Sequence, residues 1–163
     1  MEPRNKVIFD QKNMLLQLRP KISDIVREEG KDTEEKLRSI CQLLKVSVPY
    51  YDWVGFYFRN GDKEELQLGP YAGAPTDHTL IPFGKGICGQ VAVSNQNFVV
   101  PDVSLQDNYI ACSATVRAEI VVPLFVDGKN IGQIDIDSHT PDPFSEDDER
   151  LLEYVNREVA QLF

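Results

Sequence analysis

The chain has 163 residues, a formal net charge of −9 at pH 7, three cysteines and two histidines. A chain of this length commonly forms one domain with a core of its own. Its acidic surface should repel phosphate backbones and anionic lipids, which argues against nucleic acid and membranes as partners. The few cysteines and histidines predict neither a zinc site nor a disulfide framework. Because no long apolar run or signal-peptide pattern is visible, we expect a cytoplasmic protein.

Apolar residues between Met14 and Val26 recur at helical spacing and predict a first helix. Pro20 lies inside this stretch, so we expect a break or kink just before the proline. The stretch belongs to an N-terminal helical segment, residues 1–30, which should pack on a single domain spanning residues 1–163.

A second helix should begin after Asp32 or Thr33, either of which can cap it. Its apolar residues recur at intervals of three and four: Leu37, Ile40, Cys41, Leu44 and Val48. Cys41 therefore faces the core and is interpreted as a structural residue.

Residues 53–59 alternate in polarity and predict a strand, which a turn at Gly61-Asp62 connects to a second strand over residues 65–71. Trp53 and Tyr57 are four residues apart and so share one face of the first strand. They could line a pocket for a cationic or apolar ligand. Packing in the core is the alternative for both.

Three glycines, Gly84, Gly86 and Gly89, introduce a short helix over residues 86–93. Their spacing matches neither common phosphate-binding loop, so the glycines are interpreted as permitting a sharp turn. Cys88 would lie in the first turn of this helix, where the helix dipole favours a thiolate and makes it a redox candidate.

A brief strand over residues 98–100 precedes a polar, irregular stretch, 103–117, that is a candidate pocket loop. Residues 119–126 and 131–137 then form a second hairpin across Asp127-Gly128. A final helix should begin after Ser145 and continue to Leu162. Sequential hairpins and flanking helices predict an α+β fold with a mostly antiparallel sheet.

One thiol and three carboxylates follow one another closely: Cys112, Glu119, Asp135 and Asp137. A two-residue turn would place Asp135 opposite Ile120 and Asp137 opposite Ala118, with Glu119 beside both. If the carboxylates share a pocket, their mutual repulsion keeps at least one protonated near neutral pH, ready to donate a proton. The alternatives are that Cys112 is a small core residue and that the acids face solvent.

Several segments, in the same order along the chain, resemble the free methionine-(R)-sulfoxide reductases, which are single-domain GAF-fold enzymes. The segments are Asp52-Trp53-Val54-Gly55-Phe56-Tyr57, Leu68-Gly69-Pro70-Tyr71, Ile81-Pro82-Phe83-Gly84-Lys85-Gly86-Ile87-Cys88-Gly89, Ile110-Ala111-Cys112, Glu119-Ile120-Val121-Val122-Pro123-Leu124 and Asp135-Ile136-Asp137-Ser138. The resemblance implies a GAF-like six-stranded antiparallel sheet with helices on its faces, and a homodimer. It also implies reduction of free methionine-R-sulfoxide, with no bound cofactor or metal and with a thioredoxin-like thiol as external reductant.

By the same resemblance, Cys112 is the nucleophile that attacks the sulfoxide sulfur and becomes a sulfenic acid. The carboxylates of Glu119, Asp135 and Asp137 would bind the substrate's ammonium group and supply a proton. The substrate-binding residues would further include the aromatic wall of Trp53 and Tyr57, together with Ile110 and Ala111.

His78 occupies the position at which members of this family commonly have a further cysteine. Cys88 could resolve the sulfenic acid in its place, or an external thiol could do so directly. A non-catalytic GAF module that binds a small molecule, or that senses redox state through its cysteines, is the alternative function.

Overall fold

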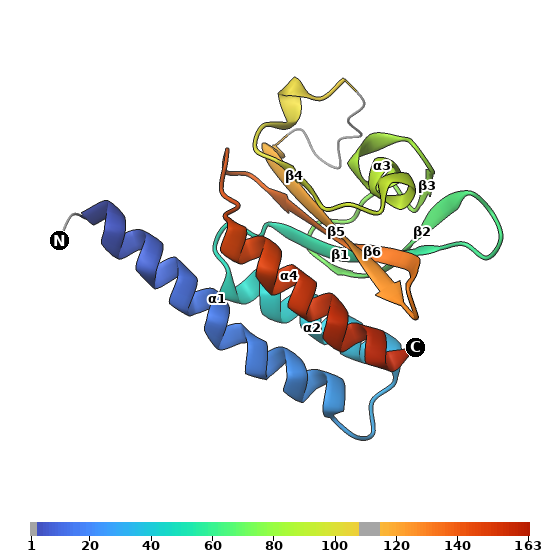
Figure 1. Cartoon of the computed structure of the whole chain (residues 1–163), viewed down its shortest axis with the longest axis horizontal. Helices are drawn as coiled ribbons and strands as arrows, with labels where there is room; N and C mark the ends of the chain where they lie inside the picture. Colours follow the sequence, from blue (N-terminus) through green and yellow to red (C-terminus); the bar gives the residue numbers. More distant parts are fainter. Residues whose placement is uncertain (1–2, 108–114) are drawn as a thin grey trace.

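The computed structural model describes residues 3–107 and 115–163, and a six-stranded sheet forms its centre (Figure 1). Every neighbouring pair of strands in the sheet is antiparallel, and the strand order is β3-β2-β1-β6-β5-β4. The strands are β1 Trp53–Arg59, β2 Glu65–Ala72, β3 Leu80–Pro82, β4 Phe98–Val100, β5 Ala118–Val126 and β6 Lys129–Ser138. The fold class expected from the sequence is confirmed, and the short strand β3 is an addition to the elements read from residue patterns.

Helices cover both faces of the sheet, but unequally (Figure 1). One face carries α2 (Thr33–Ser47) and α4 (Glu146–Val159, followed by a 3₁₀ turn at Ala160–Leu162), and α1 (Pro3–Arg27) packs against both helices. The other face carries only the short helix α3 (Gly86–Ser94), with a 3₁₀ turn at Val103–Leu105. Within the described residues, none of the helices is long and apolar enough to cross a membrane.

Two apolar clusters follow from the alternation of side chains along the strands. The larger lies between the sheet and helices α1, α2 and α4, and it contains Val54, Phe56 and the fully buried Cys41. The smaller lies under α3 and contains Trp53, Tyr57 and Cys88. The predicted two faces of β1 and the structural role of Cys41 are thereby confirmed.

The N-terminal caps of α2 and α4 agree with the sequence prediction. The Asp32 carboxylate accepts a hydrogen bond from the Glu35 N–H at 2.9 Å. Ser145 and Asp148 form a reciprocal capping box at the start of α4. Asp148 is fully buried and also accepts hydrogen bonds from two tyrosine hydroxyls, Tyr50 at 2.9 Å and Tyr51 at 2.6 Å. One carboxylate therefore fastens α4 to the segment that leads into β1.

The expected break at Pro20 is wrong, because α1 continues through the proline as one helix. Proline removes one backbone hydrogen bond from a helix. The buried residues on both sides of it, Leu15, Leu18, Ile22 and Val26, all belong to the larger apolar cluster. Packing of this stripe against the domain holds the two halves of α1 in one line, since tertiary contacts supply most helix stability in proteins.

Asn156 joins α4 to the sheet through its side-chain amide. Its Nδ2 donates to the carbonyl oxygens of Val122 and Pro123, both at 3.0 Å. Strand β4 pairs with β5 only from Glu119 to Val121, so these two carbonyls lie just beyond the last pairing with β4 in the described sheet.

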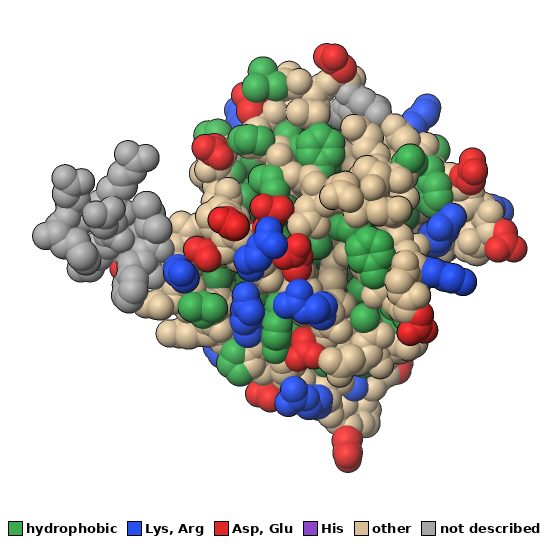
Figure 2. All heavy atoms as spheres, in the orientation of Figure 1, with side chains coloured by type: hydrophobic (Ala, Val, Ile, Leu, Met, Phe, Trp, Pro, Cys, Tyr) green, Lys and Arg blue, Asp and Glu red, His purple; other side chains and the backbone are tan. Residues whose placement is uncertain are grey.

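Charges of both signs are intermingled on the face shown in Figure 2, where red acidic and blue basic side chains alternate over the helices. Arg150 forms an ion pair with Glu153 at 2.8 Å, and Arg27 lies 4.0 Å from Glu158. The net negative charge is thus not gathered into one patch on this side of the molecule.

Candidate functional site

The candidate site lies on the α3 face of the sheet, where β1, β5 and β6 present their polar residues. Glu119 on β5 pairs directly with Asp137 on β6, and Asp135 pairs with Val121. All three carboxylates are at least nine-tenths buried, which is unusual for acids in central strands. The structure therefore brings the three acids to one face, as the sequence reasoning required, and excludes solvent-facing acids.

The predicted register of this hairpin was wrong by one residue. The turn itself is as expected, since Asp127 and Gly128 both have positive φ, 51° and 77°, as a type I′ turn demands. An irregularity between Leu124 and Phe125 shifts the pairing beyond it. A bulge of this kind adds one residue to one strand. As a result Asp137 faces Glu119 instead of Ala118.

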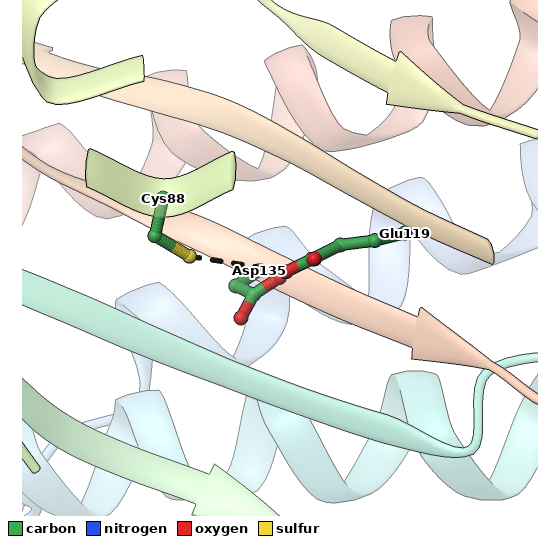
Figure 3. A group of neighbouring side chains, drawn as sticks. All are labelled: Cys88, Glu119 and Asp135. Atoms are coloured by element: carbon green, nitrogen blue, oxygen red, sulfur yellow. Dashed lines mark hydrogen bonds between the residues drawn. The ribbon is translucent and has the colours of Figure 1, made fainter. Parts of the chain in front are cut away.

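Cys88, Glu119 and Asp135 form a compact group at the centre of the site (Figure 3). One ligand atom from each residue lies within 4.8 Å of the others. The Cys88 Sγ donates to Glu119 Oε2 at 3.9 Å. Figure 3 shows the Cys88 side chain extending from α3 toward the sheet, where Asp135 and Glu119 meet it. The exposed fractions are 5% for Cys88, 5% for Glu119 and 1% for Asp135.

Burial controls the protonation of this group. Burial raises the pKa of the Asp135 carboxyl above its ordinary value, and hydrogen bonds from Glu119 and Cys88 only partly oppose that shift. The acid spacing predicts a retained proton through mutual repulsion, whereas desolvation is the larger cause in the structure. Asp135 consequently keeps a proton to higher pH than an exposed aspartate does.

The prediction that the helix dipole makes Cys88 a thiolate is wrong. Burial raises the pKa of its thiol well above the usual value, and the charges of Asp135 and Glu119 raise it further. The first turn of α3 does hold Cys88, but the side chain points at acids instead of solvent or cations. Gln133 donates to the Cys88 carbonyl at 3.1 Å and fixes the backbone of α3 over the sheet.

An aromatic wall stands beside the acids. Trp53 stacks on Tyr71 with ring centroids 5.4 Å apart and lies 6.3 Å from the Tyr57 ring. The indole N–H donates to the Ala74 carbonyl at 3.0 Å, which fixes the ring orientation. Trp53 lies directly over Gly55, where any larger residue would collide with it. Tyr71 was not predicted as part of the wall, because its strand had no feature that pointed to a site.

A narrow pocket opens beside the acid cluster, and its free volume of about 10 Å³ is close to that of a single water molecule. It is lined by Tyr57, His78, Ile81, Lys85, Gly86, Ile87, Cys88, Glu119 and Asp135. The Tyr57 hydroxyl donates to the His78 carbonyl at 3.0 Å. Tyr57, which the sequence assigned to the aromatic wall, therefore also positions the backbone of His78 in the pocket lining. Sequence reasoning did not assign Lys85 to the site, although it stands within the glycine-rich segment.

Three predicted site residues, Ile110, Ala111 and Cys112, lie outside the described residues. The described residues before and after this segment pack on the face of the sheet that carries the pocket. Val103 and Val116 are buried in the apolar cluster that also contains Cys88. The Thr115 hydroxyl lies 3.2 Å from His139 Nε2, and the Asp52 carboxylate accepts from the His139 backbone N–H at 2.7 Å.

A wider groove between α4 and β5 is chemically less suited to a site. Its acids, Glu149 and Glu153, already accept hydrogen bonds from Asn97 at 3.2 and 3.1 Å. Glu153 is also paired with Arg150 at 2.8 Å. The thiol of Cys88, the buried acids Glu119 and Asp135, and Tyr57 of the aromatic wall line the narrower pocket.

Comparison with known proteins agrees with this geometry. Residues 32–163 match the family model of the GAF domain. The protein YtsP of Bacillus subtilis is 38% identical over 149 residues, which are 89% of this chain and 91% of that protein. The free methionine-R-sulfoxide reductase of Escherichia coli is 40% identical over 126 residues, which are 77% of this chain and 73% of that protein.

A solved structure extends the likeness to three dimensions. The free methionine-R-sulfoxide reductase of Neisseria meningitidis, in complex with its substrate, superimposes with a TM-score of 0.87 at 36% identity and covers 93% of this chain and 89% of that one. The chain therefore belongs to the GAF domain family. Within that family it belongs to the group that includes the free methionine-R-sulfoxide reductases, so the resemblance drawn from the sequence is confirmed.

Proposed function

We propose that this protein reduces free methionine-R-sulfoxide to methionine in the pocket between α3 and the sheet. The observation that carries the proposal is the buried pair of Glu119 and Asp135 on the pocket wall, in which burial raises the pKa of Asp135. Such a pair supplies both a proton and negative charge. The named relatives and the substrate complex of a similar structure support the same substrate.

The three carboxylates explain selectivity for the free amino acid. Free methionine sulfoxide carries an α-ammonium group, which a methionine residue inside a peptide lacks. A buried carboxylate that pairs with this ammonium gains a partner in a region of low dielectric. The aromatic wall of Trp53 and Tyr57 would contact the substrate's methyl group, at the other end of the substrate from the ammonium group.

Cys112 is the proposed nucleophile. Its sulfur attacks the sulfoxide sulfur while a protonated acid, Asp135 or a neighbour, donates to the sulfoxide oxygen. The S–O bond of the substrate breaks and the oxygen passes to the Cys112 sulfur, so that methionine leaves as the thioether with two electrons gained, while Cys112 loses two electrons and becomes a sulfenic acid. Position 112 is three residues before Thr115 in the chain, a reach of at most about 11 Å. The buried position of Val116 on the pocket side supports this assignment.

The sulfenic acid must then be reduced by a thiol, with release of water and formation of a disulfide. The burial of Cys88 and its raised pKa keep that thiol protonated and therefore weakly nucleophilic. We therefore favour direct attack by an external, thioredoxin-like dithiol over resolution by Cys88. No bound cofactor takes part in this sequence, and assembly as a homodimer and a cytoplasmic location stay predictions.

The test is an assay with the separate R and S isomers of free methionine sulfoxide and a dithiol reductant. We expect turnover of the R isomer alone, loss of turnover in Cys112→Ser, and activity close to wild type in the core control Cys41→Ser. Equal rates on both isomers, or none on either, would contradict the proposal. Tight binding of free methionine by calorimetry, without turnover under any reductant, would instead indicate a non-catalytic binding module.

Mass spectrometry of the oxidised protein identifies the route of recycling. After one turnover without reductant, we expect a sulfenic acid at Cys112 that an external thiol removes. An intramolecular disulfide between Cys88 and Cys112 would show that Cys88 resolves the intermediate. A disulfide that forms with peroxide alone, without any reaction with methionine sulfoxide, would indicate a redox sensor.

A further inference from the structure

Cys88, Glu119 and Asp135 offer a sulfur and two carboxylate oxygens to a common point in the pocket (Figure 3). We propose that these three residues bind a thiophilic divalent metal ion, such as Zn²⁺, and that the ion competes with the substrate. This inference goes beyond the proposed reduction, which uses no metal, and it does not require that the reduction occurs.

The distances fit a small tetrahedral ion. Zinc binds sulfur at about 2.3 Å and carboxylate oxygen at about 2.0–2.2 Å, so a sulfur and an oxygen on one tetrahedral ion are about 3.6 Å apart. The Cys88 Sγ and Glu119 Oε2 are 3.9 Å apart, and the Asp135 oxygen lies within 4.8 Å of both. Side-chain movements of a few tenths of an ångström to about 1 Å would bring all three atoms to bonding distance.

Unpartnered buried oxygens provide an independent indication that a cation fits here. Asp135 is 1% exposed, and its Oδ1 accepts no hydrogen bond in the described structure. The Oε1 of Gln133, two residues earlier on the same face of β6, is also buried without a partner among the described atoms. Buried acceptors without a donor are costly, and a bound cation would satisfy Asp135 directly.

The ligand set favours a particular class of ion. A cysteine sulfur selects soft or borderline ions such as Zn²⁺ and Cd²⁺ over Mg²⁺ and Ca²⁺, which prefer sites made only of oxygen. Binding replaces protons: the Cys88 thiol and any protonated carboxyl of the group lose theirs as the ion enters. Three protein ligands leave the fourth position of a tetrahedral ion open to water.

The sequence did not predict this site, because its three ligands come from distant segments. Cys88 lies on α3, Glu119 on β5 and Asp135 on β6, with no paired cysteines or histidines at the short spacing of known zinc motifs. Only the packing of α3 across the two central strands brings the ligands together. The expectation of no metal site rested on spacing along the chain, which does not detect ligands from distant segments.

Titration of the untagged, fully reduced protein with Zn²⁺ by isothermal calorimetry tests the site. We expect one ion per chain in wild type and in the core control Cys41→Ser. Cys88→Ser and Asp135→Asn should each weaken Zn²⁺ binding by at least about tenfold. This lower bound is the loss of affinity, about tenfold, that follows even when a residue that only supports a metal ligand is replaced. With Co²⁺ in place of Zn²⁺, wild type should show the near-ultraviolet charge-transfer band of a cobalt–thiolate bond, and Cys88→Ser should not.

Two results would overturn the inference. One is the absence of Zn²⁺ binding by wild type, and the other is binding by Cys88→Ser and Asp135→Asn that equals wild type, provided circular dichroism shows both variants folded. Free methionine should lower the apparent affinity for Zn²⁺, because both ligands need Glu119 and Asp135; unchanged affinity would refute the competition.

The metal site and the proposed function can fail separately. Zn²⁺ binding that requires Cys88, in a protein inactive on either sulfoxide, would leave the metal site standing and refute the reductase. Turnover of the R isomer without any Cys88-dependent metal binding would support the reductase and refute the metal site.

Discussion

The aromatic wall depends on the absence of a side chain at Gly55. A Cβ placed there would lie 2.4 Å from Trp53 Cη2, 2.7 Å from Cζ3 and 2.9 Å from the Tyr71 Cβ. Ordinary contacts begin near 3.4 Å. The residue has no positive φ, so alanine meets no backbone strain, and the substitution Gly55→Ala acts through its contacts with the Trp53 ring and the Tyr71 Cβ.

We expect Gly55→Ala to displace the Trp53 ring by about 1 Å, because the ring must withdraw to restore ordinary contact. Overpacking of this kind typically costs about 1–3 kcal/mol of stability. A displacement of about 1 Å in a group that positions substrate can cost about 100-fold in rate. We therefore expect kcat/KM for free methionine-R-sulfoxide to fall by one to two orders of magnitude, roughly, while the fold persists.

The measurements are steady-state kinetics with the R isomer and denaturant unfolding of the same samples. Gly69→Ala is the matched control: its Cβ would lie 2.8 Å from the Phe58 ring, which belongs to the larger apolar cluster on the far face of the sheet. It should lose stability yet keep kcat/KM near wild type. Wild-type kinetics in Gly55→Ala, at a temperature where it is fully folded, would refute the positioning role of Trp53.

Three further substitutions test the fold and the electrostatics. Asp148→Ala removes the acceptor of two tyrosine hydroxyls and one half of a capping box. In urea titrations it should lower the free energy of unfolding by about 3–5 kcal/mol. A loss below about 1 kcal/mol would contradict the role given to this carboxylate. Asp32→Ala, which removes an exposed cap, should cost only about 1 kcal/mol in the same measurement. Because the folded state binds a proton at Asp135 more tightly than the unfolded state does, the contribution of Asp135 to the stability of wild type should fall as the pH rises from 3.8 through the raised pKa. Asp135→Asn should remove that part of the pH dependence, and an unchanged stability–pH curve would exclude the raised pKa.

Local patterns in the sequence were sufficient to predict most helices and strands. The caps at Asp32 and Ser145, the two faces of β1 and the turn at Asp127-Gly128 depend on residues close together in the chain, and each was predicted. The register between β5 and β6 was not predicted, because no residue pattern in the sequence indicates the bulge after Leu124. A one-residue shift in a strand changes which residue faces which, so an irregularity far from the site decided that Asp137 meets Glu119.

Among the described residues, the sequence singled out side chains that the structure brings to one face of the sheet, but it did not predict their electrostatics. The three acids and both aromatic residues were identified from strand parity and family resemblance. The protonation of Cys88 depends on which residues pack against α3, and β5 and β6 follow it by about thirty and forty-five residues. The local dipole argument favoured a thiolate, but desolvation by distant strands is the larger effect. Likewise, the continuous helix through Pro20 reflects packing that no local rule contains.

The amide of Asn156 has a consequence for how the protein behaves at high concentration. The outer side of β5 beyond Val121 would otherwise present free carbonyls next to an apolar strand, a surface that invites strand addition by another molecule. Asn156 occupies the carbonyls of Val122 and Pro123, and Pro123 itself has no N–H to offer. One side chain from α4 thus partly compensates for the short length of β4, because it occupies two carbonyls that strand addition would otherwise use.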